Sequence, residues 1–365
     1  MTVLFIGSGH RNFSDFLRPK SRGRLAAYGA LFDHSYAIAF TRPGFSVETL
    51  SPNMTAHPTN SASRYMAPFD ALRLGKQILS TVPKGEKVII SAQDPFESAF
   101  VAQRLAKRFG AILHIQVHTD FLAKEFVGER WENRIRYVLA LYFLPRADCI
   151  RVVSVRIKRS LVRRFPELER RITVLPIWSS PLSIVRVPSA KGRFNILMVS
   201  RFEPEKRIRD ALAAFKKFWE KTKSGKLTIV GVGSLLDDCE QLAENLGLRE
   251  RVIFAGWQDN LASHYAAADV FLLTSRYEGW GVAAADAVYA GIPVVMTDVG
   301  LAGELVQDGE NGIVTPVGDI DAITEALFSV LANPNRFKPQ QPLERESLEK
   351  YLDRYREALY RCRRG

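Results

Sequence analysis

The sequence predicts an α/β protein built from two Rossmann-like domains, each a doubly wound parallel sheet, and three observations support this. The chain has 365 residues, enough for two domains with a core in each. In both halves, short apolar runs alternate with longer segments of helical spacing, as in parallel α/β sheets. A proline- and serine-rich break with little periodicity separates the halves. We therefore expect an N-terminal domain at residues 1–180, a linker at 181–192 and a C-terminal domain at 193–335.

The N-terminal half contains four short apolar runs that predict buried strands. Helical spacing between them predicts helices at Ala99–Phe109 and Val155–Phe165. The amphipathic stretch Arg130–Leu144 is expected to be a buried core helix, although its pattern would also suit contact with a membrane. The predicted strands are Val3–Ile6, Lys87–Ser91, Ile112–Val117 and Cys149–Val153.

The C-terminal half shows the same alternation more clearly, and six strands with helices between them make one doubly wound unit. A Pro-, Gln- and Asn-rich break at 333–342 precedes a last charged helix, Glu344–Arg361, within a C-terminal segment at 343–365. The predicted strands are Phe194–Ser200, Lys226–Val230, Arg251–Phe254, Val270–Thr274, Pro293–Thr297 and Gly312–Thr315. The predicted helices are Arg209–Thr222, Leu235–Leu246, Val282–Ala290 and Ile320–Ala332.

Composition excludes several classes of protein. Apolar residues make up 47% and charged residues 25%, which is the composition of a globular chain. The longest apolar stretch, 138–144, is far shorter than the ~20 residues that span a bilayer. The opening run lacks a basic flank and reads as a strand, so we expect no signal peptide. Three scattered cysteines suggest neither a disulfide framework nor a metal cluster, and we expect a cytoplasmic protein.

The net charge of +12 is concentrated in the first half of the chain. Residues 1–185 hold 27 Lys and Arg against 14 Asp and Glu, whereas the remainder holds 24 against 25. The densest basic run, Arg151–Arg171, fits either an anionic partner or a solvated helix surface. No aromatic-interleaved or zinc-finger pattern favours nucleic acid. We expect weak, salt-sensitive contact of this half with an anionic membrane at the cytoplasmic face.

The strongest local motif is the run Ser-Arg-Phe-Glu-Pro-Glu-Lys-Arg at 200–207. It follows an apolar strand and precedes a helix, so Arg201 and Lys206 are expected on a loop at the carboxyl edge of the sheet. A planar guanidinium and a mobile ammonium suit a diphosphate. The alternative is a solvated loop containing an Arg–Glu pair.

The second motif runs from Thr274 to Asp286 as a strand, a glycine-bearing turn and a helix that begins near Gly281. Glycine lets the backbone approach a ligand, and the free N–H groups of a first helical turn attract phosphate. Glu278 falls on the turn and Asp286 about two helical turns later. Two such carboxylates can accept hydrogen bonds from hydroxyl-bearing parts of one ligand. The apolar neighbours of Asp286 indicate that its charge needs a partner.

Two glycine pairs give weaker signals. Gly7 and Gly9 follow the first strand in a tight turn that could admit a phosphate or an acceptor, but the full dinucleotide fingerprint is missing. Gly231 and Gly233 follow the strand 226–230 in the same way.

Metal binding receives little support from the sequence. His114 and His118 share one face of a predicted strand, but no third or fourth ligand is near, so no metal is expected. His118, at the strand's carboxyl end, is better placed for a ligand cleft. Asp319 and Asp321 match an Asp-x-Asp motif only as text, and capping of the helix that follows is the expected role.

Together these blocks resemble the retaining glycosyltransferases of family four, which have a GT-B architecture of two facing Rossmann-like domains around a cleft. The C-terminal blocks that carry the resemblance are 200–207, Val-Ile-Phe-Ala-Gly at 252–256, Tyr-Ala-Ala-Ala-Asp-Val at 265–270, Glu278 through Asp286, Ala-Gly-Ile-Pro-Val-Val at 290–295 and Asp-Gly-Glu-Asn-Gly at 308–312. Less specific N-terminal blocks are Gln93-Asp94-Pro95, Gln-Val-His-Thr-Asp at 116–120 and Ala-Asp-Cys-Ile at 147–150.

The resemblance implies roles for particular residues. Arg201 and Lys206 would hold the donor diphosphate and stabilise the leaving nucleotide in place of a metal ion. Glu278 would contact the donor sugar, and the N–H groups of Val282 and Ala283 would contact the diphosphate.

Further roles follow from the same resemblance. Phe254 to Trp257 would border the base, and His118 would lie beside the donor sugar and the acceptor. The glycine turns, Gly7 with Gly9 and Gly231 with Gly233, would admit the donor. The expected activity is transfer of a sugar from a nucleotide-diphosphate sugar to a hydroxyl of a glycan or glycolipid in cell-surface polysaccharide or glycolipid synthesis, with no cofactor or metal. The last helix would return to the first domain.

Two departures from the family pattern bear on the site. Asp286 stands where the family has a ribose-binding Glu, so its reach is one methylene shorter. The segment 175–178 lacks the family's Asn and Asp. Two other functions stay open on this architecture: a catalytically silent nucleotide-sugar-binding homologue and a nucleotide-sugar epimerase. An NAD dehydrogenase is disfavoured because Gly-x-Gly-x-x-Gly is absent.

Overall fold

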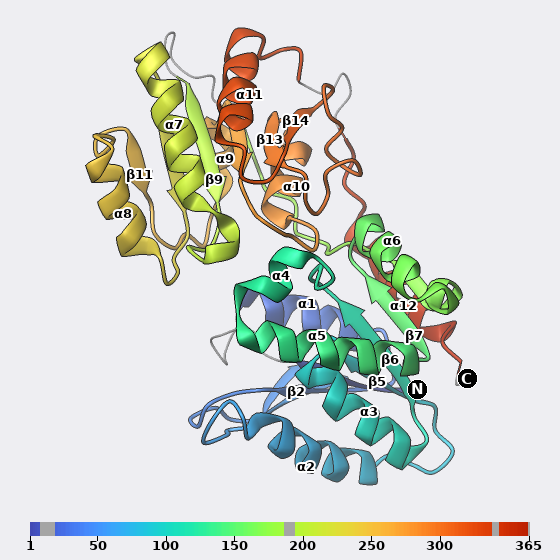
Figure 1. The fold of residues 1–365 in the computed structure, drawn as a ribbon. Helices are drawn as coiled ribbons and strands as arrows, with labels where there is room; N and C mark the ends of the chain where they lie inside the picture. Colours follow the sequence, from blue (N-terminus) through green and yellow to red (C-terminus); the bar gives the residue numbers. More distant parts are fainter. Residues whose placement is uncertain (8–18, 186–193, 338–342, 364–365) are drawn as a thin grey trace. The chain divides into compact units, whose positions relative to one another are not determined.

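The computed structural model of the protein describes residues 1–7, 19–185, 194–337 and 343–363, and these form two compact units (Figure 1). Unit 1 comprises residues 1–176 together with 347–365, and unit 2 comprises residues 177–346. The chain therefore passes from one unit to the other at 176–177 and again at 346–347. The expected linker at 181–192 lies inside unit 2, and most of it falls outside the described residues.

Unit 1 is built on an eight-stranded sheet in the order β3-β4-β2-β1-β5-β6-β7-β8. All neighbouring strands are parallel except β3 and β4. The strands are β1 (Thr2–Gly7), β2 (His34–Ala39), β3 (Glu48–Ser51), β4 (Met54–Pro58), β5 (Val88–Ala92), β6 (Ile112–Val117), β7 (Cys149–Val152) and β8 (Ile172–Val174).

The helices of unit 1 come from both parts of the chain that form it. Helix α3 packs against β1, β5 and β6 and also against α2 and α5. The helices are α1 (Pro19–Gly29), α2 (Ala67–Ser80), α3 (Glu97–Phe109), α4 (Lys124–Glu129), α5 (Trp131–Phe143), α6 (Val155–Arg164) and α12 (Leu348–Tyr360), with short 3-10 turns at Leu144–Arg146 and Pro166–Arg171.

Unit 2 is built on a six-stranded, wholly parallel sheet in the order β11-β10-β9-β12-β13-β14. Its core contains five buried phenylalanines, two of which lie on α7. The strands are β9 (Asn195–Val199), β10 (Lys226–Val230), β11 (Val252–Phe254), β12 (Val270–Leu273), β13 (Val294–Thr297) and β14 (Gly312–Thr315). The helices are η4 (Pro204–Lys206), α7 (Ile208–Thr222), α8 (Leu236–Asn245), α9 (Ala262–Ala267), α10 (Val282–Tyr289) and α11 (Ile320–Ala332).

The predicted fold class is confirmed, and each of the ten predicted strands is present to within two residues at either end. Helix α11 begins as expected, because the Asp319 side chain accepts a hydrogen bond from the Ala322 N–H. Strands β2, β3, β4 and β8 were not predicted. They are three to six residues long, and polar residues interrupt each of them, so no continuous apolar run marks them.

Arg151 lies in the core of unit 1, and its inclusion in a solvated basic run was wrong. Its guanidinium donates to the carbonyls of Leu175 and Pro176 at 3.0 Å, to Gln116 Oε1 at 2.8 Å and to the Tyr351 hydroxyl at 2.6 Å. A buried cation is tolerated only when its donors are satisfied, which explains this cage. The cage joins the end of the first segment of unit 1 to α12.

The expectation of no disulfide was wrong for two of the three cysteines. Cys149 at the start of β7 is bonded to Cys362 after α12, while Cys239 is free and buried. The partners are 213 residues apart in sequence, and only the packing of α12 on unit 1 brings them together. The spacing of the cysteines in the sequence therefore did not indicate this disulfide.

The expectation that the stretch 130–144 forms a buried core helix was also wrong in part. Helix α5 is present, and Asn133, Ala140 and Phe143 are buried. Its other face exposes large apolar side chains, among them Trp131 and Val138. Within the described part of the chain, no helix is long and apolar enough to cross a membrane.

The disulfide predicts a difference in alkylation. Aerobically purified, denatured protein should take up one carbamidomethyl group without reductant, on Cys239, and three after reduction, as measured by intact mass. Cys149→Ser should take up two groups without reductant, because Cys362 loses its partner. Three labels on the unreduced parent protein would contradict the pairing.

Candidate functional site

The candidate site lies where the strand order of unit 2 reverses. The chain builds outward from β9 to β10 and β11, then returns to place β12 on the other side of β9. The loops that follow β9 and β12 therefore leave adjacent strands in opposite directions, and ligands of open α/β sheets bind at such a point. These two loops are the ones that contain the predicted motifs, 200–207 and 274–286.

Lys206 and Glu278 meet across these loops. The Lys206 ammonium donates to Glu278 Oε1 at 2.6 Å, and the Ser275 hydroxyl donates to the same oxygen at 2.8 Å. Both charged side chains are largely buried, 13% and 15% exposed. A short, partly desolvated ion pair with an added hydrogen bond holds both groups in defined positions.

Backbone contacts hold the same two loops together below the ion pair. The Thr274 hydroxyl donates to the carbonyl of Lys206 at 2.9 Å, and the Arg276 N–H donates to the carbonyl of Glu205 at 2.7 Å. Arg207 takes a left-handed conformation, with φ of 49°, that ends η4 and starts α7. The position of Lys206 is thus set by the turn as well as by its partner.

Arg201 lies near the start of the same loop. Its guanidinium is half-exposed and pairs with Glu205 Oε1 at 3.0 Å. Glu205 is only 7% exposed, and its second carboxylate oxygen has no hydrogen-bond partner among the described residues. The Arg–Glu pair that sequence analysis offered as the alternative is therefore present, and Arg201 still has donors that face solvent.

Helix α10 begins beside the ion pair, four residues after Glu278. Gly281, the residue before the helix, has φ of 98°, a conformation that favours glycine. No described side chain caps this end, so the N–H groups of the first turn, at Val282 and Ala283, are available to an anion.

Gly231 and Gly233 have a structural reason for being glycine. A Cβ on Gly231 would lie 2.0 Å from the carbonyl oxygen of Ser200, and one on Gly233 would lie 2.4 Å from that of Phe202. These glycines let the loop after β10 pack against the loop after β9, where the Phe202 N–H donates to the Val232 carbonyl at 3.1 Å. They shape the Arg201 loop, and their contact with a phosphate stays a prediction.

Phe254 and Trp257 lie at the end of β11 and in the loop after it. The Phe254 ring packs 5.9 Å from that of Phe202, so it belongs with the wall behind the Arg201 loop. Trp257 is 53% exposed and its indole N–H donates to Asp259 at 3.1 Å. An exposed aromatic ring near a sheet edge suits stacking with a base.

Asp286 is held by protein groups. Its Oδ1 accepts from the Arg345 guanidinium and from the Ser179 hydroxyl, each at 2.8 Å, and both charged side chains are about 10% exposed. Arg345 also donates to the carbonyls of Ser179 and Ser180 and lies over the Tyr289 ring at 4.4 Å. The partner that the apolar neighbourhood of Asp286 required is therefore Arg345.

The unit 1 candidates lie at the carboxyl ends of two strands. Gly7 ends β1 and His118 follows β6, while Gly9 lies outside the described residues. His114 is buried inside β6, where its Nδ1 lies 2.9 Å from the Ser91 hydroxyl. Burial, and next the charge of Arg151, lower the pKa of His114 to about 3, so its ring is neutral at pH 7. Burial also raises the pKa of Asp120.

Three contributors to the site were not singled out by sequence analysis. Ser275 supports Glu278, Glu205 holds Arg201, and Arg345 holds Asp286. Ser275 and Glu205 lie within the quoted motifs, so the motif spacing could have found them. Arg345 lies 59 residues from its partner, and no local pattern marks it.

The arrangement concentrates positive charge and backbone donors at one edge of the sheet. Lys206, the free face of Arg201 and the first turn of α10 can bind an anion, and Glu278 can accept hydrogen bonds from hydroxyls. Among the described residues, no group of three or more His, Cys, Asp or Glu side chains could hold a metal ion.

Comparison with known proteins shows what the chain is similar to. Residues 182–350, which include most of unit 2, match the family profile of glycosyl transferases group 1. The HepE protein of Anabaena, in complex with UDP and glucose, superposes with a TM-score of 0.73 at 16% identity, over 99% of this chain and 100% of that one. The protein has the GT-B fold.

Curated relatives match over about half of this chain. The N-acetyl-alpha-D-glucosaminyl L-malate synthase of Bacillus anthracis is 31% identical over 171 residues, 45% of each chain. The lipopolysaccharide core biosynthesis glycosyltransferase LpsE of Rhizobium meliloti is 36% identical over 204 residues, which cover 54% of this chain and 58% of LpsE. The chain spans about half the length of the curated relatives it matches.

The close approach of Gly231 to the Ser200 carbonyl predicts that a side chain at position 231 would destabilise the protein. Gly231→Ala should destabilise the protein by about 2–4 kcal/mol, because the new methyl group meets the Ser200 carbonyl, as measured by urea unfolding. Gly247→Ala is the matched control: its φ is also positive, at 68°, but the space is open, so about 1 kcal/mol is expected. Equal losses of unfolding free energy in the two variants would show that the backbone shifts to remove the contact between the new methyl group and the Ser200 carbonyl, and would contradict the prediction.

The Arg345–Asp286 contact predicts a large effect of its removal. Arg345→Ala should cost about 3 kcal/mol in the free energy of unfolding, because it leaves a buried carboxylate unpaired. Arg249→Ala removes an exposed ion pair with Glu244 in the same unit and should cost less than about 0.5 kcal/mol. A loss in Arg345→Ala as small as that of the control would contradict the assignment.

Proposed function

We propose that the protein is a retaining, metal-independent glycosyltransferase that moves a sugar from a nucleotide-diphosphate sugar to an acceptor hydroxyl. The Lys206–Glu278 ion pair at the strand-order reversal of unit 2, beside the uncapped start of α10, carries the proposal. It supplies a cation for the diphosphate and a carboxylate for the sugar at one place. The group 1 profile match over the same residues supports this assignment.

In this proposal the donor diphosphate binds Lys206, Arg201 and the N–H groups of Val282 and Ala283. Arg201 turns its solvent-facing donors to the diphosphate and keeps its contact with Glu205. Glu278 accepts hydrogen bonds from sugar hydroxyls when the ligand draws Lys206 toward the phosphates. The donor thus replaces an existing internal ion pair, which offsets part of the desolvation cost of binding.

The chemical step needs no protein base in this scheme. The bond from C1 of the sugar to the β-phosphate oxygen breaks, and the acceptor oxygen bonds to C1 on the same face. The departing phosphate takes the proton of the acceptor hydroxyl, and Lys206 and Arg201 stabilise its negative charge. His118 contacts the sugar or the acceptor in this proposal.

The proposed acceptor is a glycan or glycolipid at a membrane surface. LpsE is named for lipopolysaccharide core biosynthesis, and the strong positive charge of unit 1 suits an anionic membrane. UDP-sugars are the first donors to test, because the HepE structure is a complex with UDP and glucose.

The role of Lys206 gives the direct test. Turnover of the UDP-sugar that stabilises the protein most in a thermal-shift screen should fall about 10²–10³-fold in Lys206→Ala, because one stabilising charge on the leaving group is lost. Released UDP is the readout. Lys217→Ala, an exposed lysine of the same unit, should leave the rate unchanged.

Three results would contradict all or part of the proposal. Full activity of Lys206→Ala would remove its role at the diphosphate. Donor binding by the parent protein without transfer or hydrolysis, over a panel of acceptors, would favour a catalytically silent homologue. Inversion at C1 in the product would overturn the retaining mechanism alone.

A further inference from the structure

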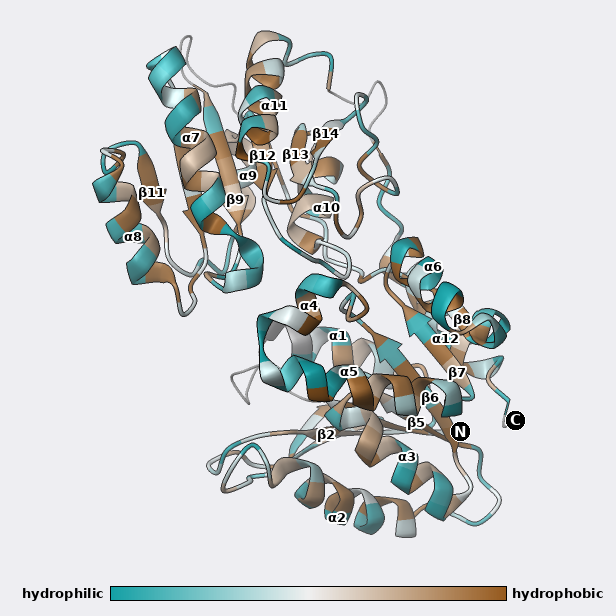
Figure 2. Ribbon diagram, in the orientation of Figure 1, coloured by the Kyte–Doolittle hydropathy of each residue, from teal (hydrophilic) through white to brown (hydrophobic). Residues whose placement is uncertain are grey.

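The outer face of α5 is apolar although it faces solvent. Trp131, Ile135, Val138 and Tyr142 are 60%, 52%, 62% and 50% exposed. Their spacing of four, three and four residues places them on one stripe of the helix. Figure 2 shows hydrophobic residues interspersed with hydrophilic ones along α5. An ordinary surface helix of this length would bury such a stripe.

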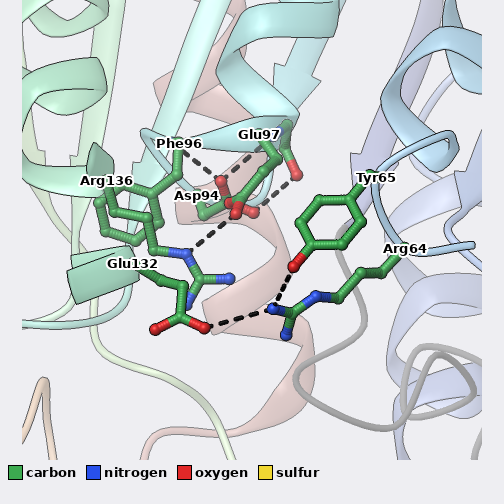
Figure 3. A network of polar contacts seen from close by, with 8 residues as sticks. Arg64, Tyr65, Asp94, Phe96, Glu97, Glu132 and Arg136 are labelled. Carbon is green, nitrogen blue, oxygen red and sulfur yellow. Dashed lines mark hydrogen bonds and ion pairs between the residues drawn. The ribbon is translucent and has the colours of Figure 1, made fainter. Parts of the chain in front are cut away.

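A second apolar group lies beside the start of α5. Tyr65, Met66 and Phe69, at the start of α2, are 63%, 48% and 57% exposed. The Arg64 guanidinium contacts the Tyr65 hydroxyl at 2.8 Å and Glu132 of α5 at 3.2 Å, and Figure 3 shows it lying between them. We call these three residues and the four of the α5 stripe the α5 surface.

Aromatic contacts join the two groups underneath. The Phe69 ring packs edge-on against Phe100 of α3 at 6.1 Å, and Phe100 packs against Phe143 of α5 at 6.5 Å. Phe143 in turn contacts Tyr142 at 5.1 Å. The α5 surface therefore rests on one continuous layer of packed rings.

Polar contacts fix which side of α5 faces outward. Arg136 donates to Glu97 of α3 at 3.0 Å, and Asn133 donates to the Phe126 carbonyl at 2.8 Å (Figure 3 shows the first contact). Glu132 is engaged by Arg64. The polar residues of α5 that pair with the protein thus occupy its inner and lateral sides, and turning the apolar stripe inward would break these contacts.

Arginines surround the apolar residues. Arg64 lies over the Tyr65 ring at 4.8 Å, Arg104 over Phe100 at 3.7 Å and Arg146 over Tyr142 at 3.7 Å. Arg134 lies on the exposed stripe itself, and neither Arg134 nor Arg146 has a carboxylate partner among the described residues. Long arginine side chains can keep the charge at a lipid headgroup while the stem covers apolar surface.

The net charge of unit 1 is positive, like the arginines around the α5 surface. Unit 1 holds 33 Lys and Arg against 17 Asp and Glu, whereas unit 2 holds 18 against 22. The return of the C-terminal segment to unit 1 therefore raises its formal charge to +16. Such a field attracts an anionic bilayer before any apolar contact forms.

We propose that the α5 surface is a membrane-docking site that inserts its apolar side chains into the interfacial layer of an anionic bilayer. Tryptophan and tyrosine favour that layer, and the flanking arginines pair with lipid phosphates. The inference deepens the proposed function by naming the surface that meets the membrane. It requires no turnover, so it can fail while the glycosyltransferase assignment stands.

The experiment measures binding of the full chain to vesicles. Phosphatidylcholine vesicles containing about one quarter phosphatidylglycerol should bind the protein at low salt, and pure phosphatidylcholine vesicles should bind it weakly. Ile135→Ser with Val138→Ser should lower the partition coefficient about tenfold, also at high salt where only the apolar contribution remains. Arg134→Glu should lower it chiefly at low salt.

Tyr360 and Arg361, at the end of α12, are the positions of the control variants. Tyr360 is 47% exposed, and Arg361 is exposed as well. Helix α12 packs on the sheet face that carries Gln116. Tyr360→Ser and Arg361→Glu should leave vesicle binding within about twofold of the parent protein. Each variant should keep parental UDP binding, and Lys206→Ala should keep parental vesicle binding. Parental UDP binding of the surface variants and parental vesicle binding of Lys206→Ala would show that the membrane proposal and the glycosyltransferase proposal can fail separately.

A measurement on the unaltered protein guards against variants that fail to fold. Shallow brominated lipids should quench tryptophan fluorescence in bound protein, and most of this quenching should disappear in Trp131→Phe. Unchanged vesicle binding in the serine variant, or no quenching of Trp131, would overturn the proposal. A concentration-dependent dimer without vesicles, abolished by the serine variant, would also overturn it and assign the surface to a second copy.

Discussion

The arrangement of the candidate site in unit 2 depends on the ion pair between Lys206 and Glu278. It joins two loops whose strands are neighbours in the sheet although the residues are 72 apart in sequence. Because a largely buried charge is costly without a partner, each residue fixes the position of the other while no ligand is bound. The contacts of the Thr274 hydroxyl and the Arg276 N–H with the other loop join the two loops independently of the ion pair.

The points where the chain changes unit are held by two other buried arginines. Arg151 binds the carbonyls of Leu175 and Pro176 and the Tyr351 hydroxyl, within unit 1. Arg345 binds Asp286 and the backbone of Ser179, within unit 2. The residues that flank each change of unit are therefore held by an arginine of the unit to which they belong. Asp286 lies on α10, so this anchor is built into the same helix whose first turn is proposed to bind the diphosphate.

The same preference for satisfied charges explains the unusual surface of α5. Two of its three charged residues, Glu132 and Arg136, are used in contacts with the residues before α2 and with α3, and Arg134 is exposed beside the apolar side chains on the outside. The membrane proposed for this surface would relieve the exposure, and the arginines around the rings would be retained at its edge. Positive charge and apolar exposure therefore occur in one unit, and the proposed catalytic charges in the other.

The sequence alone determined the two sheets, the ten apolar strands and the two motifs that meet at the site, because periodicity and loop position are local properties of a chain. It also determined that Asp286 needs a partner. Only the tertiary structure decided which partner that is, that Arg151 is buried, that Cys149 joins Cys362 and that the apolar stripe of α5 faces outward. Each depends on segments far apart in sequence. The short strands β3 and β4, which no apolar run marks, likewise depend on the hydrogen bonds of neighbouring strands.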